Sequence, residues 1–117
     1  MAVVRSDARE VKRREPPQPT VQRLVNSEVG ATQISLQIND VVIGEAVRPH
    51  LHNVEEVLYV VTGHCSMRLD DREHVLHPGD AAVVPPDVLH GFANQSAEPL
   101  RVVAVLASAS PKTTYRD

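Results

Sequence analysis

The sequence has one cysteine, no long apolar run and no excess of positive charge, and each of these absences excludes a class of protein. The single cysteine, Cys65, cannot form a disulfide within the chain, so nothing indicates an oxidising compartment. No stretch approaches the roughly 20 apolar residues that cross a bilayer. The N-terminal segment contains neither the apolar core nor the small-residue cleavage site of a signal peptide. We therefore expect a soluble, cytoplasmic protein with no membrane partner.

The charge balance argues against a nucleic-acid partner. The chain has 12 Lys and Arg against 15 Asp and Glu, which gives a formal net charge of −3. Many of the basic residues lie near the N-terminus, so the rest of the chain is more acidic still. A surface of this sign repels a phosphate backbone, and we expect no binding to nucleic acid.

A length of 117 residues with 42% apolar content allows one domain with a small core. We expect this domain over residues 21–108, between an N-terminal arm at 1–20 and a C-terminal tail at 109–117. The arm is charged and ends in a proline-rich stretch at 16–19, which disfavours helix and central strand. It is either a flexible tail or a segment that pairs with the sheet edge of a neighbouring subunit. Because a small domain gains from covering one of its faces, we expect a homodimer.

The pattern after the arm is that of β-strands separated by turns. In "ATQISLQI" polar and apolar residues alternate, with Ile34, Leu36 and Ile38 on one face, which is typical of a half-buried strand. Turn residues recur about every ten positions, as at Asp70-Asp71, where they predict a hairpin, and in "HPGD". No segment has a convincing 3.6-residue period. These patterns predict an all-β sandwich or barrel.

The segment "RPHLHNVEE" contains the first candidate metal ligands. His50 and His52 are one residue apart, so on a strand both side chains point the same way and can reach one ion. A short bend would let Glu56 return its carboxylate from the next strand, and His90 opens a further strand after a proline corner. With six histidines in the chain, an H-x-H pattern is weak by itself. The assignment therefore depends on the surrounding residues.

The spacing of those residues resembles the two motifs of the cupin superfamily. The first motif runs glycine, five residues, His-x-His, three residues, glutamate, six residues, glycine, and this chain matches it at Gly44, His50, His52, Glu56 and Gly63. The second runs glycine, five residues, proline, one residue, glycine, two residues, histidine, three residues, asparagine, and this chain matches it at Gly79, Pro85, His90 and Asn94. The middle glycine of the second motif is replaced by Asp87, and aspartate tolerates a left-handed backbone better than most residues.

The resemblance implies a double-stranded β-helix, the jelly-roll barrel of small single-domain cupins, with a metal ion in its mouth. By position, the ligands of one divalent ion per chain would be His50, His52, Glu56 and His90. Three neutral imidazoles and one carboxylate leave two neighbouring positions of an octahedral site open, which favours Fe2+ or Mn2+ and also allows Ni2+. Zn2+ is possible, although four ligands nearly saturate it.

Four further side chains on the predicted strands are candidates for the substrate pocket: Tyr59, Met67, Phe92 and Arg101. Each has an alternative interpretation. Met67 and Phe92 also suit core packing, Arg101 suits a surface ion pair, and the odd spacing of Tyr59 from Glu56 favours the other face of the sheet. Cys65 is interpreted as a small core residue, because free cysteine is among the most buried residue types.

The sequence contains no Ser-His-Asp arrangement, phosphate-binding glycine loop or paired acidic dyad, so any chemistry would run through the metal. Small cupins similar to this chain include polyketide cyclase-like proteins, dioxygenases and sugar-acid processing proteins. We therefore predict a metal-dependent enzyme acting on a small oxygen-bearing molecule, of the dioxygenase, isomerase, cyclase or decarboxylase type, with Glu56 as its catalytic acid–base group. The alternatives are a non-catalytic module that binds or senses a small ligand, and a structural or storage role.

Overall fold

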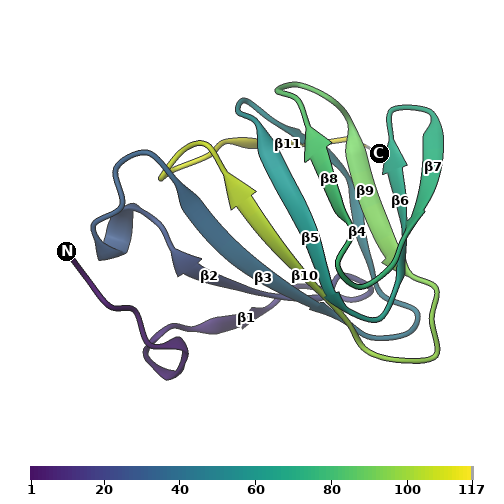
Figure 1. Cartoon of the computed structure of the whole chain (residues 1–117), viewed down its shortest axis with the longest axis horizontal. Coiled ribbons are helices and arrows are strands. Elements are labelled where there is room, and N and C mark those ends of the chain that lie inside the picture. The colour runs from purple at the N-terminus through teal and green to yellow at the C-terminus, as the bar shows by residue number, and fades with distance from the viewer. Residues whose placement is uncertain (117) are drawn as a thin grey trace.

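The computed structural model describes residues 1–116 and shows two antiparallel β-sheets that face each other (Figure 1). The six-stranded sheet has the order β1-β2-β3-β10-β5-β8 and the five-stranded sheet the order β11-β4-β9-β6-β7. The first sheet contains β1 (Val11–Arg13), β2 (Thr20–Val25), β3 (Ser35–Val41), β10 (Leu100–Leu106), β5 (Glu56–Thr62) and β8 (Ala81–Val84). The second contains β11 (Thr113–Tyr115), β4 (Ala46–His52), β9 (His90–Asn94), β6 (Cys65–Leu69) and β7 (Arg72–Leu76).

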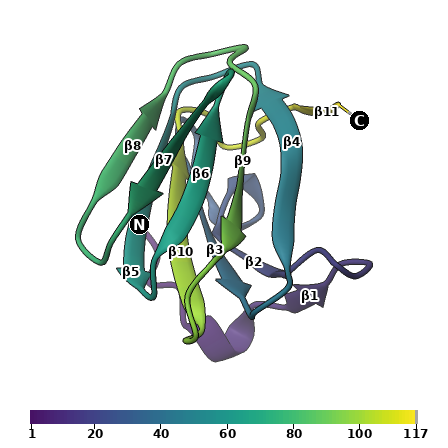
Figure 2. The same ribbon diagram turned by 90° about the vertical axis from the view of Figure 1, so that its right-hand side faces the viewer.

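From β3 onward the chain crosses repeatedly between the two sheets. In Figure 2 the strands β4, β9, β6 and β7 lie in front, and β3 and β10 of the other sheet lie behind them. The hairpin expected at Asp70-Asp71 joins β6 to β7. This winding is that of a jelly roll, so the predicted all-β double-stranded β-helix is confirmed. The helical segments within residues 1–116 are the short turns η1 (Ser6–Ala8) and η2 (Ser27–Val29), and no helix there is long and apolar enough to cross a membrane.

The core between the sheets is built from apolar side chains at alternate strand positions. Its buried members are Val41, Val47, Leu58, Val60, Cys65, Met67, Ala82, Val84, Phe92, Leu100, Val102, Ala104 and Leu106. The interpretation of Cys65 as a core residue is confirmed, since its side chain is fully buried. Burial raises the pKa of the Cys65 thiol to about 11.

Strand β3 differs from an ordinary half-buried strand because its polar face is the inner one. Ser35 and Asn39 are 6% and 5% exposed and line the internal cavity. Leu36 and Ile38 lie on the opposite face and are half-buried. The alternation predicted from the sequence is present, but the side that faces the interior is the polar one.

The apolar face of β3 continues across the outside of the six-stranded sheet. Cross-strand pairing aligns two rows of apolar side chains over β3, β10, β5 and β8, and paired residues share a face of the sheet. The rows are Leu36, Val105, Val57, Val83 and Ile38, Val103, Tyr59, Ala81, which together we call the outer apolar face. Tyr59 is 45% exposed and Val83 is 61% exposed, so this face is open to solvent in the single chain.

The two terminal segments lie against the sheets. β1 extends the six-stranded sheet by pairing with β2. The side-chain amide of Gln22 donates hydrogen bonds to the carbonyl oxygens of Ser6 (2.8 Å) and Arg9 (3.2 Å), which fixes η1 against β2. β11 pairs with β4 at the edge of the other sheet. Both terminal segments contribute to the wall of the internal cavity, with Arg14 on the N-terminal side and Thr113 and Tyr115 among the residues on the C-terminal side.

The corner before β9 has the backbone conformation that the second motif requires. Asp87 has a φ of 65°, which is the left-handed region that glycine would otherwise occupy. Its amide donates a 2.8 Å hydrogen bond to the carbonyl oxygen of His52, so the corner is tied to β4. A Cβ on Gly91 would lie 2.8 Å from the carbonyl oxygen of Val47, so only glycine allows β9 to approach β4 this closely. The result is that His90 stands directly opposite β4.

Candidate metal centre

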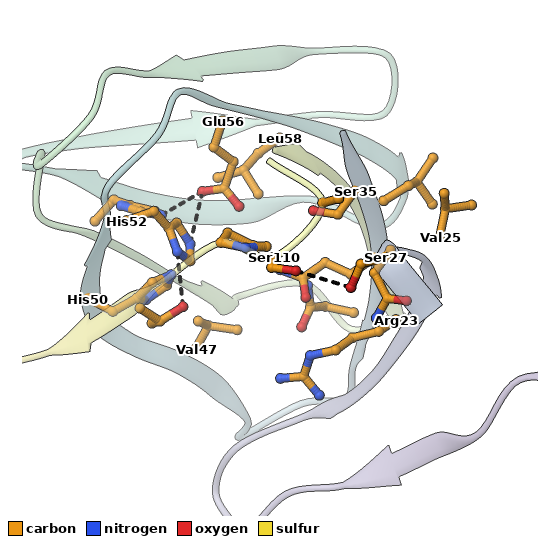
Figure 3. Close-up of a pocket in the computed structure, with 18 of the residues that line it drawn as sticks. Arg23, Val25, Ser27, Ser35, Val47, His50, His52, Glu56, Leu58 and Ser110 are labelled. Atoms are coloured by element: carbon orange, nitrogen blue, oxygen red, sulfur yellow. Dashed lines mark hydrogen bonds and ion pairs between the residues drawn. The ribbon is translucent and has the colours of Figure 1, made fainter. Parts of the chain in front are cut away.

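The structure brings the four predicted ligands together on one wall of the cavity. His50 and His52 are on β4, Glu56 begins β5 and His90 begins β9, directly opposite His50 in the strand register. One ligand atom from each residue lies within 4.8 Å of all the others. All four side chains are at most 6% exposed. Figure 3 shows Glu56 facing His50 and His52 across this cluster.

Two of the imidazoles are oriented by backbone carbonyl groups. His50 Nδ1 lies 2.8 Å from the carbonyl oxygen of Arg48, and His90 Nδ1 lies 2.9 Å from that of Val88. A carbonyl oxygen can only accept, so Nδ1 carries the proton in both rings. In a neutral imidazole the lone pair is then on Nε2, which is the atom that points into the cluster. Outer hydrogen bonds of this kind are typical of histidines that bind metals.

The third imidazole is oriented by the C-terminal strand. The Thr113 hydroxyl of β11 lies 3.0 Å from His52 Nδ1, and Thr113 pairs with His52 in the strand register. Tyr115, two residues further, pairs with His50 and lies with its ring 5.6 Å from the His50 ring. β11 therefore covers the outer side of the histidine cluster.

The atoms that point into the cluster lack partners of their own. His52 Nε2, His90 Nε2 and Glu56 Oε1 are buried, and none makes an aligned hydrogen bond within residues 1–116. Glu56 Oε1 is only 2.7 Å from His90 Nε2 and 3.6 Å from His52 Nε2. A buried unsatisfied polar atom costs about 1–3 kcal/mol, so a divalent cation at the meeting point would satisfy all three. The donor set fits a metal of the Mn, Fe, Ni or Zn type.

Burial also controls the protonation of the histidines. It lowers the pKa of His50 to about 3, and it lowers the pKa of His52 against the opposing effect of the Glu56 carboxylate. Burial acts in the same direction on His90, but Glu56 and the carbonyl group of Val88 outweigh it, so the pKa of His90 is raised. A proton and a metal ion would compete for the Nε2 atom of His90, so metal binding at this cluster is expected to depend on pH.

The cavity beside the cluster has a volume of about 270 Å³. Small-molecule pockets usually measure about 300–1,000 Å³, so this cavity suits a small molecule. Near the metal cluster its wall includes the apolar residues Val47 and Leu58, and Phe92, which pairs with Val47 in the strand register, also lines the cavity. The remaining wall comes from β2, β3, the segment after β2 and the terminal segments, and it combines polar side chains with the apolar residues Val25, Leu36, Ala109 and Pro111. Its polar side chains include Arg14, Arg23, Ser35, Gln37, Asn39 and Tyr115.

Of the four predicted pocket residues, Phe92 lines the cavity and the other three do not. Tyr59 and Arg101 point to the outer face of the six-stranded sheet, where Arg101 forms an ion pair with Asp40 at 2.8 Å. Their odd spacing from the inward-facing residues of β5 and β10 explains this, because neighbouring side chains on a strand alternate. Met67 is fully buried in the core and makes no part of the cavity wall. These three assignments were wrong.

The polar wall was not predicted from the sequence. The polar face of β3 was visible there as an alternating pattern, and it could have been assigned to the cavity if the apolar face had been recognised as the outer one. Arg14 and Tyr115 had no such signal, because they reach the cavity only through the way the terminal segments pair with the sheets.

Comparison of the sequence with known protein families identifies the family of this chain. The family model of the cupin domain, Cupin_2, matches residues 39–106. The chain belongs to the cupin family. The protein SchB of Streptomyces halstedii is 33% identical over 90 residues, which cover 76% of this chain and 65% of SchB. The polyketide synthase CurC of Streptomyces cyaneus is 33% identical over 85 residues, 72% of this chain and 55% of CurC. The chain thus spans less than two thirds of the length of either relative.

Solved structures agree on the fold of this cupin. The polyketide cyclase RemF of Streptomyces resistomycificus superposes with a TM-score of 0.80 at 24% identity, over 100% of this chain and 87% of RemF. An oxalate decarboxylase of Lactobacillus farciminis also gives a TM-score of 0.80, at 26% identity, over 90% of this chain and 33% of that protein. The same barrel therefore occurs in enzymes of different chemistry, and function has to be argued from the site.

Proposed function

We propose that this cupin is a metal-dependent cyclase that closes rings in a small, oxygen-rich molecule with several carbonyl groups. The observation that carries the proposal is the convergence of four buried ligand atoms on the wall of a cavity that can hold such a molecule. The names of CurC, a polyketide synthase, and RemF, a polyketide cyclase, favour cyclisation among the reactions open to this kind of centre.

The ion would be held by His50, His52, Glu56 and His90, and the donor set favours Fe2+ or Mn2+. A bound ion of this kind polarises carbonyl oxygens and so acidifies a C–H bond between two carbonyl groups. The apolar side chains beside the cluster, Val47, Leu58 and Phe92, keep water away from the reacting carbon.

Glu56 is the group that we propose to accept the proton from this carbon. Two carboxylates line the cavity within residues 1–116, and the other, Glu28, is ion-paired with Arg9 at 3.2 Å. Glu56 lies at the metal cluster, and its carboxylate is close enough to His90 and His52 for either ring to stabilise it. It is therefore the acid–base group available at the reacting end of the cavity.

The reaction is balanced without an added oxidant or reductant. The substrate carbon loses its proton to Glu56 and its electron pair forms a bond to a second carbonyl carbon of the same molecule. The oxygen of that second carbonyl group takes the proton back and becomes a hydroxyl. Loss of water then leaves a carbon–carbon double bond in the new ring.

The test is to load the purified protein separately with Fe2+, Mn2+, Ni2+ and Zn2+ and to incubate it with short linear poly-β-ketones. We expect ring formation, seen as new ultraviolet absorbance and the loss of one water by mass spectrometry, without oxygen consumption. Glu56→Gln should lower the rate of ring formation more than it lowers metal content.

Two results would overturn the cyclase proposal. Oxygen uptake with incorporation into the product would identify a dioxygenase. Tight binding of chelating ketones without conversion of any of them would support the alternative, a non-catalytic ligand-binding or sensing module.

A further inference from the structure

The cavity wall carries positive charge on two arginines, and no carboxylate forms an ion pair with either of them within residues 1–116. Arg14 and Arg23 both line the cavity, and neither is among the ion pairs of the described chain. Figure 3 shows His50 and Glu56 on one side of the cavity and Arg23 on the other. Since a divalent ion bound by one carboxylate keeps a positive charge, the filled cavity would be cationic both at the metal and at the two arginines.

Arg14 is held in a fixed position by neutral groups. Its Nε donates a 2.9 Å hydrogen bond to the carbonyl oxygen of Pro19, and its Nη2 donates a 2.7 Å hydrogen bond to Asn39 Oδ1. Burial lowers the pKa of Arg14, but a guanidinium stays charged in proteins. Neutral acceptors orient this charge without cancelling it, so a partly desolvated cation faces the cavity.

Arg23 projects from β2, where it pairs with Gln37 of β3, a further residue of the cavity wall. The Arg23 carbonyl oxygen accepts hydrogen bonds from the Arg9 side chain, which fixes the backbone at this point. Its guanidinium extends along the cavity in Figure 3 and donates no hydrogen bond within residues 1–116. Because Arg23 is more exposed than Arg14, its charge lies nearer to solvent.

Ser35 supplies a second, independent sign of a ligand. Its residue is 6% exposed, its Oγ lies on the cavity wall, and this hydroxyl has no hydrogen-bond partner within the described residues. Figure 3 shows Ser35 between the Glu56 side and the Arg23 side of the cavity. A buried hydroxyl without a partner is unfavourable, and an oxygen atom of a ligand would satisfy it.

We propose that the substrate is a free acid, with two chelating carbonyl or enol oxygens at the metal end and a carboxylate that binds to Arg14 and Arg23. Ser35 donates a hydrogen bond to an oxygen between the two ends. This inference rests on the proposed function for its chelating end. It adds that the molecule is recognised as an acid and not as a neutral ester or thioester, because two guanidinium groups match a carboxylate in charge and in hydrogen-bond geometry.

The test uses Co2+-loaded protein and a series of 1,3-diketones that carry a carboxylate on linkers of increasing length, each with its methyl ester. Binding is followed through the cobalt absorption spectrum. Acetylacetone, which carries no carboxylate, reports on chelation alone. We expect at least one acid to bind about 10- to 100-fold more tightly than its ester, the range of a charge-assisted hydrogen-bonded contact. This difference should fall as ionic strength rises.

Arg23→Gln should remove most of the difference between acid and ester and leave acetylacetone binding unchanged. The matched control is Arg101→Gln, which removes an arginine from the outer face of the same sheet. Arg14→Gln should have the same effect as Arg23→Gln, and its melting temperature separates a loss of folding from a loss of binding. Equal binding of acid and ester at every length, with acetylacetone still bound, would overturn the carboxylate proposal alone. A cobalt spectrum that no chelator changes would overturn the proposed function.

Discussion

Replacing Thr113 with valine tests whether the C-terminal strand orients the metal cluster. Thr113 Oγ1 lies 3.0 Å from His52 Nδ1, and a metal on Nε2 requires the proton to be on Nδ1. The threonine oxygen therefore accepts this hydrogen bond in the metal-bound state. Valine keeps the shape of the side chain and removes the acceptor, so the ring loses the bond that sets its tautomer and its orientation.

The magnitude follows from the exposure of Thr113. Loss of an outer-shell partner weakens metal binding by about 10- to 100-fold, which corresponds to about 1.4–2.7 kcal/mol. Thr113 is exposed, so water can reach His52 Nδ1 and replace part of the lost bond. We therefore expect the lower end, a weakening of about tenfold. The fold should be unaffected, because the backbone pairing of β11 with β4 does not involve the hydroxyl.

The assay is competition for Zn2+ or Co2+ with a chelating dye at constant pH, with circular dichroism as a check on folding. Thr114→Val is the matched control, because Thr114 is the next residue of β11, is also exposed, and points to the other face. Unchanged affinity in Thr113→Val, or an equal loss in Thr114→Val, would refute the reasoning that Thr113 positions His52.

Three further predictions concern the cluster and the core. His90→Ala should abolish binding of the ion, because it removes one ligand and leaves Glu56 Oε1 without the ring that lies 2.7 Å away. Elemental analysis of the purified variant checks this prediction. Full metal occupancy in the variant would contradict the ligand assignment. Cys65 is fully buried, and burial raises the pKa of its thiol to about 11. A thiol reagent at mildly alkaline pH should therefore label Cys65 only after denaturation. Rapid labelling of the native protein would show that this part of the core opens. Gly91→Ala would place a Cβ 2.8 Å from the carbonyl oxygen of Val47. This contact should lower the free energy of unfolding by about 1–3 kcal/mol, which chemical denaturation measures. An unchanged denaturation midpoint would mean that β4 and β9 can separate without cost.

Local rules predicted the all-β fold class from the sequence, whereas the set of candidate metal ligands came from the resemblance to the two cupin motifs. On a strand, residues two apart share a face, so His50 and His52 must point together wherever the strand lies. The turns that return Glu56 and His90 to the same place are encoded by short segments, and Asp87 adopts the left-handed backbone that the motif requires. His90 lies opposite His50 because β9 pairs with β4, two strands far apart in the sequence, so its place in the cluster was predicted by the motif and not by a local rule.

Other parts of the site were decided by the tertiary structure. Alternation in β3 shows that the strand has two faces, but not that Ser35 and Asn39 face the cavity while Leu36 and Ile38 face outward. That choice depends on what lies on each side of the sheet: an internal cavity with room for a polar ligand on one side, and an uncovered apolar surface on the other. The prediction for Met67 failed for a related reason, since a buried residue can lie beside a cavity or away from it.

Arg14 and Tyr115 depend still more on tertiary structure. They lie near opposite ends of the chain, and each reaches the cavity only because its segment adds to a sheet, at β2 for the N-terminal side and at β4 for the C-terminal side. Pairing between distant strands is set by backbone hydrogen bonds, which any residue can form, so no sequence pattern announces it. The sequence by itself determined that His50 and His52 point together and which residues could bind the ion, and the pairing of the two terminal segments with the sheets brought Arg14 and Tyr115 to the same cavity.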